Sequence, residues 1–488
     1  MVEMRGTSRR RVAVLGAGPA GMTAAYLLSK DPNVEVMVFE ADSRVGGMAK
    51  SIDLWGQRVD IGPHRFFSDD PRVNSIWLEL MGSDYSMVSR LTRIYFDKNF
   101  YYYPLKIFNV LSNIGIIQAA LCVLSYVKER LFPRTRDPKS FEDWVISRFG
   151  ERLFKIFFKT YSEKLWGISC KDLDADFAAQ RIKKLSLFEA ILNALKFKNN
   201  QHKTLVDEFA YPHAGTGEVY ERMAQKVVQA GGQLFLSRPV KGLWTDGNKN
   251  TLGIELLDGE FLGFDHVISS IPLNKLVLSI KESPVEVRES ALKLKFRNTI
   301  IVYLEVEGTG LFPDQWLYVH DSKLQTGRVT NFRNWVPEIC QESGNTILAM
   351  EYWCYDDEQK WQLSDSDLIQ LGMKEIRETG LIENRRIIQG EVLRIPRCYP
   401  VYQTGYKESL SLVENYLSEM SGLQVIGRYG AFKYNNQDHS ILMGRLAAEN
   451  ILFQAKHNLW TINTDYEYQE ASKIENTGLS HKKTGTEE

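Results

Sequence analysis

The chain has 488 residues, which exceeds the size at which a single hydrophobic core stops growing, so we expect two or three domains. Its 60 basic and 61 acidic residues give a net charge of −1, which argues against a nucleic-acid partner held by a broad basic surface. The five cysteines are scattered and never form a C-x-x-C pair, so we expect neither a zinc site nor a disulfide framework and infer a reducing compartment.

The N-terminal segment has the order strand, glycine-rich turn, helix, strand, acid. An apolar strand over 12–15 leads into the turn, a helical pattern covers 22–29, and a second strand over 34–39 ends at Glu40. This order is the context that a dinucleotide fingerprint requires. The acid lies 19 residues after the last glycine of the turn and is placed to bind a ribose hydroxyl.

The turn itself has the spacing G-x-G-x-x-G. Gly16 allows the tight bend, Gly18 lets the backbone approach a pyrophosphate, and Gly21 lets the helix pack on the strand. The following helix N-terminus offers free N–H groups to phosphates. A second glycine pair, Gly46-Gly47, follows Glu40 closely.

Residues 107–127 form a long apolar stretch that is interrupted by five polar residues and followed by Lys128 and Arg130. Its length would suffice to span a bilayer, but the polar residues and the interior position argue against a span. We expect a buried or amphipathic helix, and interfacial membrane contact is the alternative.

The remaining elements predict a discontinuous architecture of the α/β class. A Rossmann-like dinucleotide-binding domain is expected over 1–70, 205–290 and 420–456, with a helical substrate domain inserted over 71–204. Strand-like runs predict a mixed β-sheet substrate domain over 291–419. The polar segment 457–488 is expected to be a mobile C-terminal tail.

Several separate blocks resemble the UDP-galactopyranose mutases, especially their eukaryotic-type branch, within the wider amine oxidase and protoporphyrinogen oxidase group of flavoproteins. The blocks, in chain order, are Gly46-Gly47, Asp60-Ile61-Gly62-Pro63-His64, Tyr103-Pro104, 139–144 with Tyr161, 164–166 and Gln180-Arg181, Trp316-Leu317-Tyr318 with Arg328, Tyr399-Pro400, and 427–440. The last block is the most specific, because its run from Gly427 to Ser440 has no ready structural explanation.

The resemblance implies bound FAD that is active in its reduced form, with NADPH or NADH as a candidate reductant. The family interconverts pyranose and furanose forms of a nucleoside-diphosphate sugar such as UDP-galactose, through attack by flavin N5 on the anomeric carbon and an N5–sugar adduct. A role in cell-surface polysaccharide biosynthesis follows from the same resemblance.

The resemblance also assigns residue roles. His64, Arg181 and Arg328 are the expected catalytic residues, the two arginines because a guanidinium fork can contact two phosphate oxygens. Substrate contacts are expected from Tyr103, Trp166, Tyr318, Tyr399, Tyr434 and Asn436. Cofactor contacts are expected from Gly16, Gly18, Ala20, Gly21, Glu40, Arg44, Gly46, Gly47, Met48, His64, Val240, Gly427, Arg428, Gln437, Asp438 and Ser440. His439 is expected to help cap the final helix rather than to act as a general base.

Two other functions fit the N-terminal half. An oxidising flavoenzyme of the amine oxidase, protoporphyrinogen oxidase or desaturase type would share the whole nucleotide-binding argument and would also use an apolar helix near 107–127. A non-catalytic FAD-binding protein is the third alternative. We expect no metal and no nucleic-acid partner, and a cytoplasmic location with membrane association as the alternative; the sequence leaves the sugar nucleotide, the reductant and the oligomeric state open.

Overall fold

A computed structural model describes residues 9–105, 107–176, 208–463 and 478–479. A five-stranded sheet, parallel throughout, organises one half of the molecule, in the order β19-β13-β1-β2-β9. Its strands are β1 (Arg10–Leu15), β2 (Val34–Phe39), β9 (Gln233–Phe235), β13 (His266–Ser269) and β19 (Leu423–Val425). The central strands β1 and β2 carry uninterrupted apolar runs, at 12–15 and 36–39, because both faces of a parallel sheet are covered.

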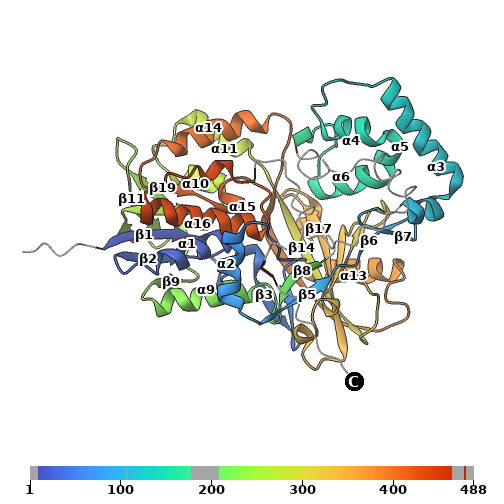
Figure 1. Ribbon diagram of the computed structural model, residues 1–488, viewed down its shortest axis with the longest axis horizontal. Helices are drawn as coiled ribbons and strands as arrows, with labels where there is room; N and C mark the ends of the chain where they lie inside the picture. Colours follow the sequence, from blue (N-terminus) through green and yellow to red (C-terminus); the bar gives the residue numbers. More distant parts are fainter. Residues whose placement is uncertain (1–8, 106, 177–207, 464–477, 480–488) are drawn as a thin grey trace, which may run out of the picture.

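Helices from distant parts of the chain cover this sheet (Figure 1). They include α1 (Pro19–Leu28), α9 (Glu218–Gln229) and α16 (Gln437–Phe453). A Cβ at Gly444 would lie 2.3 Å from the carbonyl oxygen of Ala20, so only glycine lets α16 approach α1 this closely. The parallel-sheet unit therefore joins the two ends of the chain, and the predicted discontinuous Rossmann-like domain is confirmed.

Smaller elements surround the parallel sheet. An antiparallel sheet consists of β10 (Val240–Thr245), β11 (Thr251–Leu256) and β12 (Phe261–Gly263). Two further antiparallel pairs are the hairpin of β3 (Ser51–Leu54) with β4 (Gln57–Asp60), and β5 (Tyr85–Ser89) with the distant strand β8 (Glu208–Pro212). The accompanying helices are α2 (Pro71–Met81), α10 (Leu273–Ser279), α11 (Val285–Lys293), α14 (Tyr406–Ser418) and α15 (Gly427–Gly430).

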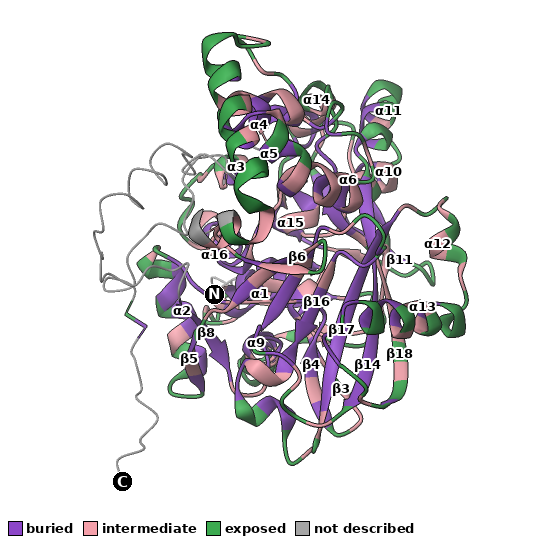
Figure 2. Ribbon diagram, turned by 90° about the vertical axis from the view of Figure 1, so that its right-hand side faces the viewer, coloured by how far each residue is buried: buried purple, intermediate pink, exposed green. Residues whose placement is uncertain are grey.

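A seven-stranded sheet forms the second half, in the order β18-β14-β17-β16-β15-β6-β7. The strands are β6 (Thr92–Phe96), β7 (Asn99–Tyr102), β14 (Phe296–Glu307), β15 (Trp316–Val319), β16 (Arg328–Asn331), β17 (Asn345–Cys354) and β18 (Ile387–Pro400). All pairs are antiparallel except β15 with β6. One face packs on α13 (Asp365–Glu378), and β14 is buried along almost its whole length (Figure 2).

A helical lobe projects beyond this sheet (Figure 1). It contains α3 (Ile107–Leu131), α4 (Phe141–Phe149), α5 (Glu151–Leu153), a π-helical turn over 154–159 and α6 (Thr160–Trp166). The helix expected near 107–127 is present, and within the described ranges none of the helices has the length and apolar character needed to cross a bilayer.

Two expectations need correction. The segment 71–204, predicted to be helical, contains β5, β6 and β7, and the last two extend the seven-stranded sheet. Aromatic residues at alternating positions, such as Tyr95 and Tyr101, are buried there as strand residues. Residues 457–463, which were expected to belong to a mobile tail, are held in place: Lys433 donates hydrogen bonds to the carbonyl oxygens of Trp460 and Ile462, and His457 Nε2 lies 2.9 Å from Glu449.

Candidate active site

The glycine-rich turn between β1 and α1 forms a cradle without side chains. Gly16 has φ +96°, and a Cβ at Gly21 would lie 1.9 Å from the carbonyl oxygen of Gly16. A Cβ at Gly47 would lie 2.9 Å from the Cα atom of Gly18, so the second glycine pair closes directly over the first turn. The N-terminus of α1 has no side-chain cap and borders the cavity, as a pyrophosphate site requires.

Glu40 lies at the end of β2 beside this cradle. Its Oε2 atom accepts a hydrogen bond from the Ala17 N–H at 2.6 Å, and its Oε1 atom accepts one from the Asp42 N–H at 2.8 Å. An ionised carboxylate has about four acceptor positions, so Glu40 retains capacity for ribose hydroxyls.

A single cavity of about 1490 Å³ joins the cradle to the seven-stranded sheet. Ligand sites are commonly about 300–1000 Å³, so the cavity has room for a dinucleotide and for a second molecule. The expected residues that line it are Gly16, Gly18, Ala20, Glu40, Gly47, Met48, His64, Tyr103, Val240, Tyr318, Arg328, Tyr399, Gly427, Arg428, Tyr434, Asn436, Gln437 and Ser440.

Five of the expected residues lie off the cavity lining, and Arg181 is outside the described residues. Arg44 is on the surface, 3.9 Å from Asp53. Gly21 and Gly46 allow neighbouring backbone segments to pack closely, since other atoms occupy the positions that their Cβ atoms would take. Trp166 and Asp438 are buried behind the lining, with 1% and 3% exposure.

The Arg328 guanidinium is held by a carboxylate on the neighbouring strand. Arg328 on β16 and Glu351 on β17 are register partners, and Nε donates to Oε1 at 2.7 Å while Nη2 donates to Oε2 at 2.5 Å. Nη2 also lies 3.4 Å from the Tyr399 hydroxyl. Burial alone would lower the pKa of Arg328. The Glu351 carboxylate nevertheless holds this pKa well above its ordinary value. The arginine is thus fixed in orientation and permanently charged.

His64 meets this ion pair across Gly62. A Cβ at Gly62 would lie 3.4 Å from His64 Cε1 and 3.9 Å from both Arg328 Nη2 and Glu351 Oε1, so the three side chains converge on a glycine. Burial, together with the charges of Arg328 and Arg428, lowers the pKa of His64 to about 3. The imidazole is therefore neutral at physiological pH.

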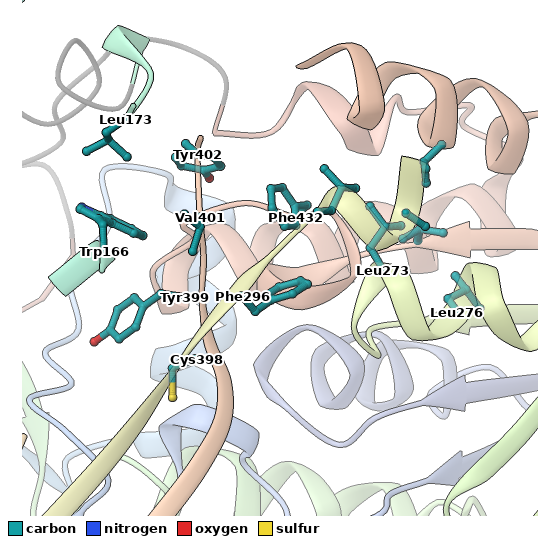
Figure 3. Close-up of a cluster of buried hydrophobic side chains, with 14 of the residues drawn as sticks. Trp166, Leu173, Leu273, Leu276, Phe296, Cys398, Tyr399, Val401, Tyr402 and Phe432 are labelled. Carbon is teal, nitrogen blue, oxygen red and sulfur yellow. The ribbon is translucent and has the colours of Figure 1, made fainter. Parts of the chain in front are cut away.

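Two stacked tyrosines form the neighbouring wall. The rings of Tyr399 and Tyr434 are 5.6 Å apart, and the Arg428 guanidinium lies 4.9 Å and 4.2 Å from their centroids. Arg428 also donates to the carbonyl oxygens of Cys398 and Asn435, both at 2.9 Å. Trp166 packs edge-on against Tyr399 at 6.2 Å, and the two lie side by side (Figure 3). Trp166 therefore supports the tyrosine wall from behind.

A second aromatic group completes the chamber, and two of its members, Tyr161 and His320, were assigned no role from the sequence. Tyr161 stacks on His320 at 4.7 Å and meets Tyr318 edge-on at 5.5 Å, while Tyr103 meets Tyr318 at 5.2 Å. Burial, with the Lys164 charge, lowers the pKa of His320 to about 3. A signal for Tyr161 was present in its motif block, but nothing in the sequence pointed to His320 or Glu351.

The N-terminus of α16 points its first residues at the same cavity. Asn436 and His439 form a reciprocal cap, in which the Asn436 N–H donates to His439 Nδ1 at 3.2 Å, so the expected capping role of His439 is confirmed. Gln437 accepts a hydrogen bond from the Tyr220 hydroxyl at 2.7 Å and is buried. In the described part of the chain, no three His, Cys, Asp or Glu side chains gather as a metal site would need.

The fold and the glycine cradle define a flavin-dependent enzyme. The model of the family "Flavin containing amine oxidoreductase" matches residues 19–452, and the chain belongs to this family. A crystal structure of reduced UDP-galactopyranose mutase is similar in fold, with a TM-score of 0.82 and 21% identity over 95% of this chain and 98% of that chain.

Sequence relatives include both oxidases and sugar-nucleotide mutases by name. Coproporphyrinogen III oxidase of Bacillus subtilis (strain 168) is 22% identical over 455 residues, which cover 86% of this chain and 93% of the relative. The dTDP-fucopyranose mutase of Escherichia coli is 25% identical over 168 residues, which cover 34% and 44%. The chain spans only 12% to 44% of the length of the first curated relatives that it matches.

Proposed function

We propose that the protein is a mutase that interconverts pyranose and furanose forms of a nucleoside-diphosphate sugar while it holds reduced FAD. The observation that carries the proposal is the chamber of Arg328, Tyr399, Tyr434 and Tyr318 in the cavity that also reaches the glycine cradle. Fixed guanidinium and phenol donors suit the oxygens of a diphosphate. An oxidase of an apolar substrate such as a polyene does not need them.

The cradle residues fit FAD, since their backbone segments approach one another closely and the Cβ position at Gly18 is open, as a pyrophosphate needs. We assign the pyrophosphate to Gly16, Gly18 and the start of α1, the ribose to Glu40, and the flavin end to His64, Arg428 and the N-terminus of α16. When bound and reduced, FAD supplies the nucleophilic N5 atom and is not consumed.

In this proposal Arg328 binds the diphosphate, and Arg181 is the second arginine proposed for that role. Glu351 fixes the orientation of the Arg328 guanidinium through Nε and Nη2. The Nη1 atom makes none of the three contacts described, so we assign it to a phosphate oxygen. Burial raises the pKa of Tyr399, so its hydroxyl stays protonated and can donate to a phosphate oxygen. The Tyr434 hydroxyl is the second phenol donor proposed for the diphosphate. The aromatic rings around them exclude water from the sugar.

Neutral His64 has a different task. Its low pKa excludes a general-acid role that starts from an imidazolium, because the ring carries no extra proton at working pH. We assign to His64 a hydrogen bond with the flavin, and this bond would orient the reacting centre.

A specific observation favours a second candidate, an FAD-dependent oxidoreductase of an apolar substrate. Part of the cavity is walled by apolar side chains of the helical lobe, namely Ile114, Cys122, Phe149, Leu153 and Phe157. A relative that covers 86% of the chain is an oxidase by name.

Turnover distinguishes the two candidates. Dithionite-reduced protein is incubated with a panel of UDP-, dTDP- and GDP-sugars, and products are separated by chromatography. A mutase yields the ring isomer without consuming an electron acceptor. Steady reduction of oxygen or a quinone by an amine, porphyrinogen or polyene, with no response to any nucleotide sugar, would establish the oxidoreductase instead.

A further inference from the structure

Helix α3 carries large apolar side chains that face solvent. Ile116, Ile117 and Leu124 are 85%, 79% and 64% exposed, and Leu131 and the following Phe132 are 67% and 73% exposed. Figure 2 shows much of this helix as exposed, and in Figure 1 it runs along the outer edge of the helical lobe. Contiguous exposed apolar surface of this kind marks an interaction site.

These side chains form one stripe rather than a scatter. The backbone at Gly115 (φ 77°) interrupts α3, and a continuous helical segment follows. With about 100° of rotation per residue, the exposed apolar positions fall within an arc of about 120°. These positions are 116, 117, 120, 123, 124, 127 and 131. We call them the α3 stripe.

The opposite side of α3 already has its partners. Ala119, Cys122 and Glu129 are buried. The polar residues Gln118 and Ser125 contact Arg152, which donates to Gln118 Oε1 through its side chain and to Ser125 Oγ through its backbone at 3.2 Å. The helix thus has a second apolar face that the packing of the described residues does not require.

Cations border the stripe. By the same rotation, the exposed residues Lys128 and Arg130 lie about 20° beyond its two edges. Residues 107–139 contain five basic side chains against two acidic ones, and one of the two, Glu129, is buried and lies 3.7 Å from Arg134. The whole chain has a net charge of −1, so this positive excess is local.

We propose that the α3 stripe lies on an anionic lipid bilayer, with the helix in the plane of the interface. Apolar side chains would enter to a depth of about 5–10 Å, while Lys128 and Arg130 extend to the headgroups. A second copy of the chain is the weaker occupant, because a two-fold contact through this stripe would bring the same cations together.

The proposal places the cavity at the membrane. Val110, Ile114, Ala119, Cys122 and Val123 of α3 line the cavity, and Val123 also belongs to the stripe. The helix that contacts lipid is therefore also a wall of the chamber, whichever reaction the chamber supports. This inference does not depend on the proposed mutase activity.

The test is co-sedimentation of the flavin-loaded full chain with two kinds of vesicle. Vesicles of equal phosphatidylcholine and phosphatidylglycerol should bind the protein, and pure phosphatidylcholine vesicles should bind it at least tenfold more weakly. Ile117→Ser/Leu124→Ser should reduce binding at least tenfold, and Lys128→Gln/Arg130→Gln should reduce it by about thirtyfold, from the usual contribution of each cation at an anionic surface. High salt should weaken binding of the parent.

The matched control is Val285→Ser/Leu292→Ser on α11, where the replaced side chains are 72% and 61% exposed. This control should bind vesicles like the parent. The proposal would be overturned if the parent did not bind the anionic vesicles at low salt. It would also be overturned if the α11 control lost as much vesicle binding as the stripe variant. A dimer in sedimentation velocity that Ile117→Ser/Leu124→Ser dissociates, without vesicle binding, would assign the stripe to a second copy. If the stripe variant fails to fold, the Lys128→Gln/Arg130→Gln pair, which is exposed, decides the outcome.

Discussion

Glu351 holds Arg328 in a two-bond ion pair inside the chamber, with side chains that are only 2% and 14% exposed. The pair links two neighbouring strands and fixes the one described arginine that we assign to the diphosphate. Removal of either partner leaves a buried charge without compensation, and this costs far more than an exposed ion pair would.

Arg328→Ala should therefore have two separable effects. It should weaken nucleoside-diphosphate binding by about 2–4 kcal/mol and reduce the free energy of unfolding by about 3–5 kcal/mol, because Glu351 loses its partner. Arg328→Met/Glu351→Leu should recover most of the stability but none of the affinity. Urea unfolding and calorimetry with UDP measure the two quantities, and parent-like UDP affinity in both variants would refute the diphosphate assignment.

Gly18→Ala and Gly21→Ala should differ, although both glycines belong to one turn. A Cβ at Gly18 would meet only the Cα atom of Gly47, at 3.8 Å, so the variant should fold normally and lose FAD affinity by at least about tenfold, because the methyl group occupies the pyrophosphate position. A Cβ at Gly21 would clash with the Gly16 carbonyl oxygen at 1.9 Å, so that variant should be unstable. Thermal unfolding of the apoproteins and flavin titration provide the comparison; a Gly18→Ala protein that retains full FAD affinity would contradict the cradle.

His64→Ala should slow turnover at least about tenfold while the dissociation constant of the nucleotide sugar stays within about twofold, since the ring faces the flavin rather than the phosphates. Because the pKa of His64 is lowered to about 3, the ring stays neutral between pH 5 and 8. The parent and the variant should therefore share the same pH–rate profile in that range. A profile whose acidic limb disappears in the variant would show that His64 titrates during turnover.

Asp60 should make stability depend on pH. Its side chain is fully buried, and burial raises its pKa to about 7 despite hydrogen bonds from Ser51, Tyr211 and the Thr216 N–H. An unfolded aspartate ionises near pH 4, so between about pH 4 and 7 the unfolded state binds fewer protons and stability falls as the pH rises, by on the order of 4 kcal/mol at most. Asp60→Asn should remove this slope in urea unfolding at pH 5 and pH 8. An equal slope in both proteins would show that Asp60 is not responsible.

Sequence reasoning succeeded where the chemistry is local. The turn from Gly16 to Gly21, the acid at Glu40 and the cap formed by Asn436 and His439 depend on neighbours along the chain, so their spacing alone predicts their geometry. The cavity then brings most of the residues expected from motif blocks to one chamber.

Prediction from the sequence failed where the pairing register of distant strands decides which side chains meet. Glu351 reaches Arg328 only because β16 pairs with β17 in one particular register, and no motif in the sequence specifies that pairing. Trp166 lies in a matched block, yet the fold places it behind Tyr399 instead of on the cavity lining. The strands β6 and β7 were missed because their aromatic residues resemble those of the helices around them.

The central claim is that this flavoenzyme isomerises a nucleotide sugar without net oxidation. The most direct measurement is the rate of ring isomerisation of UDP-galactose, and of the other sugars in the panel, by one protein preparation poised in its oxidised and then in its reduced state, with oxygen and quinone consumption followed in parallel. The account predicts isomerisation of at least one sugar only in the reduced state, with no acceptor consumed. Stoichiometric acceptor consumption with no ring isomer formed in either state would contradict it.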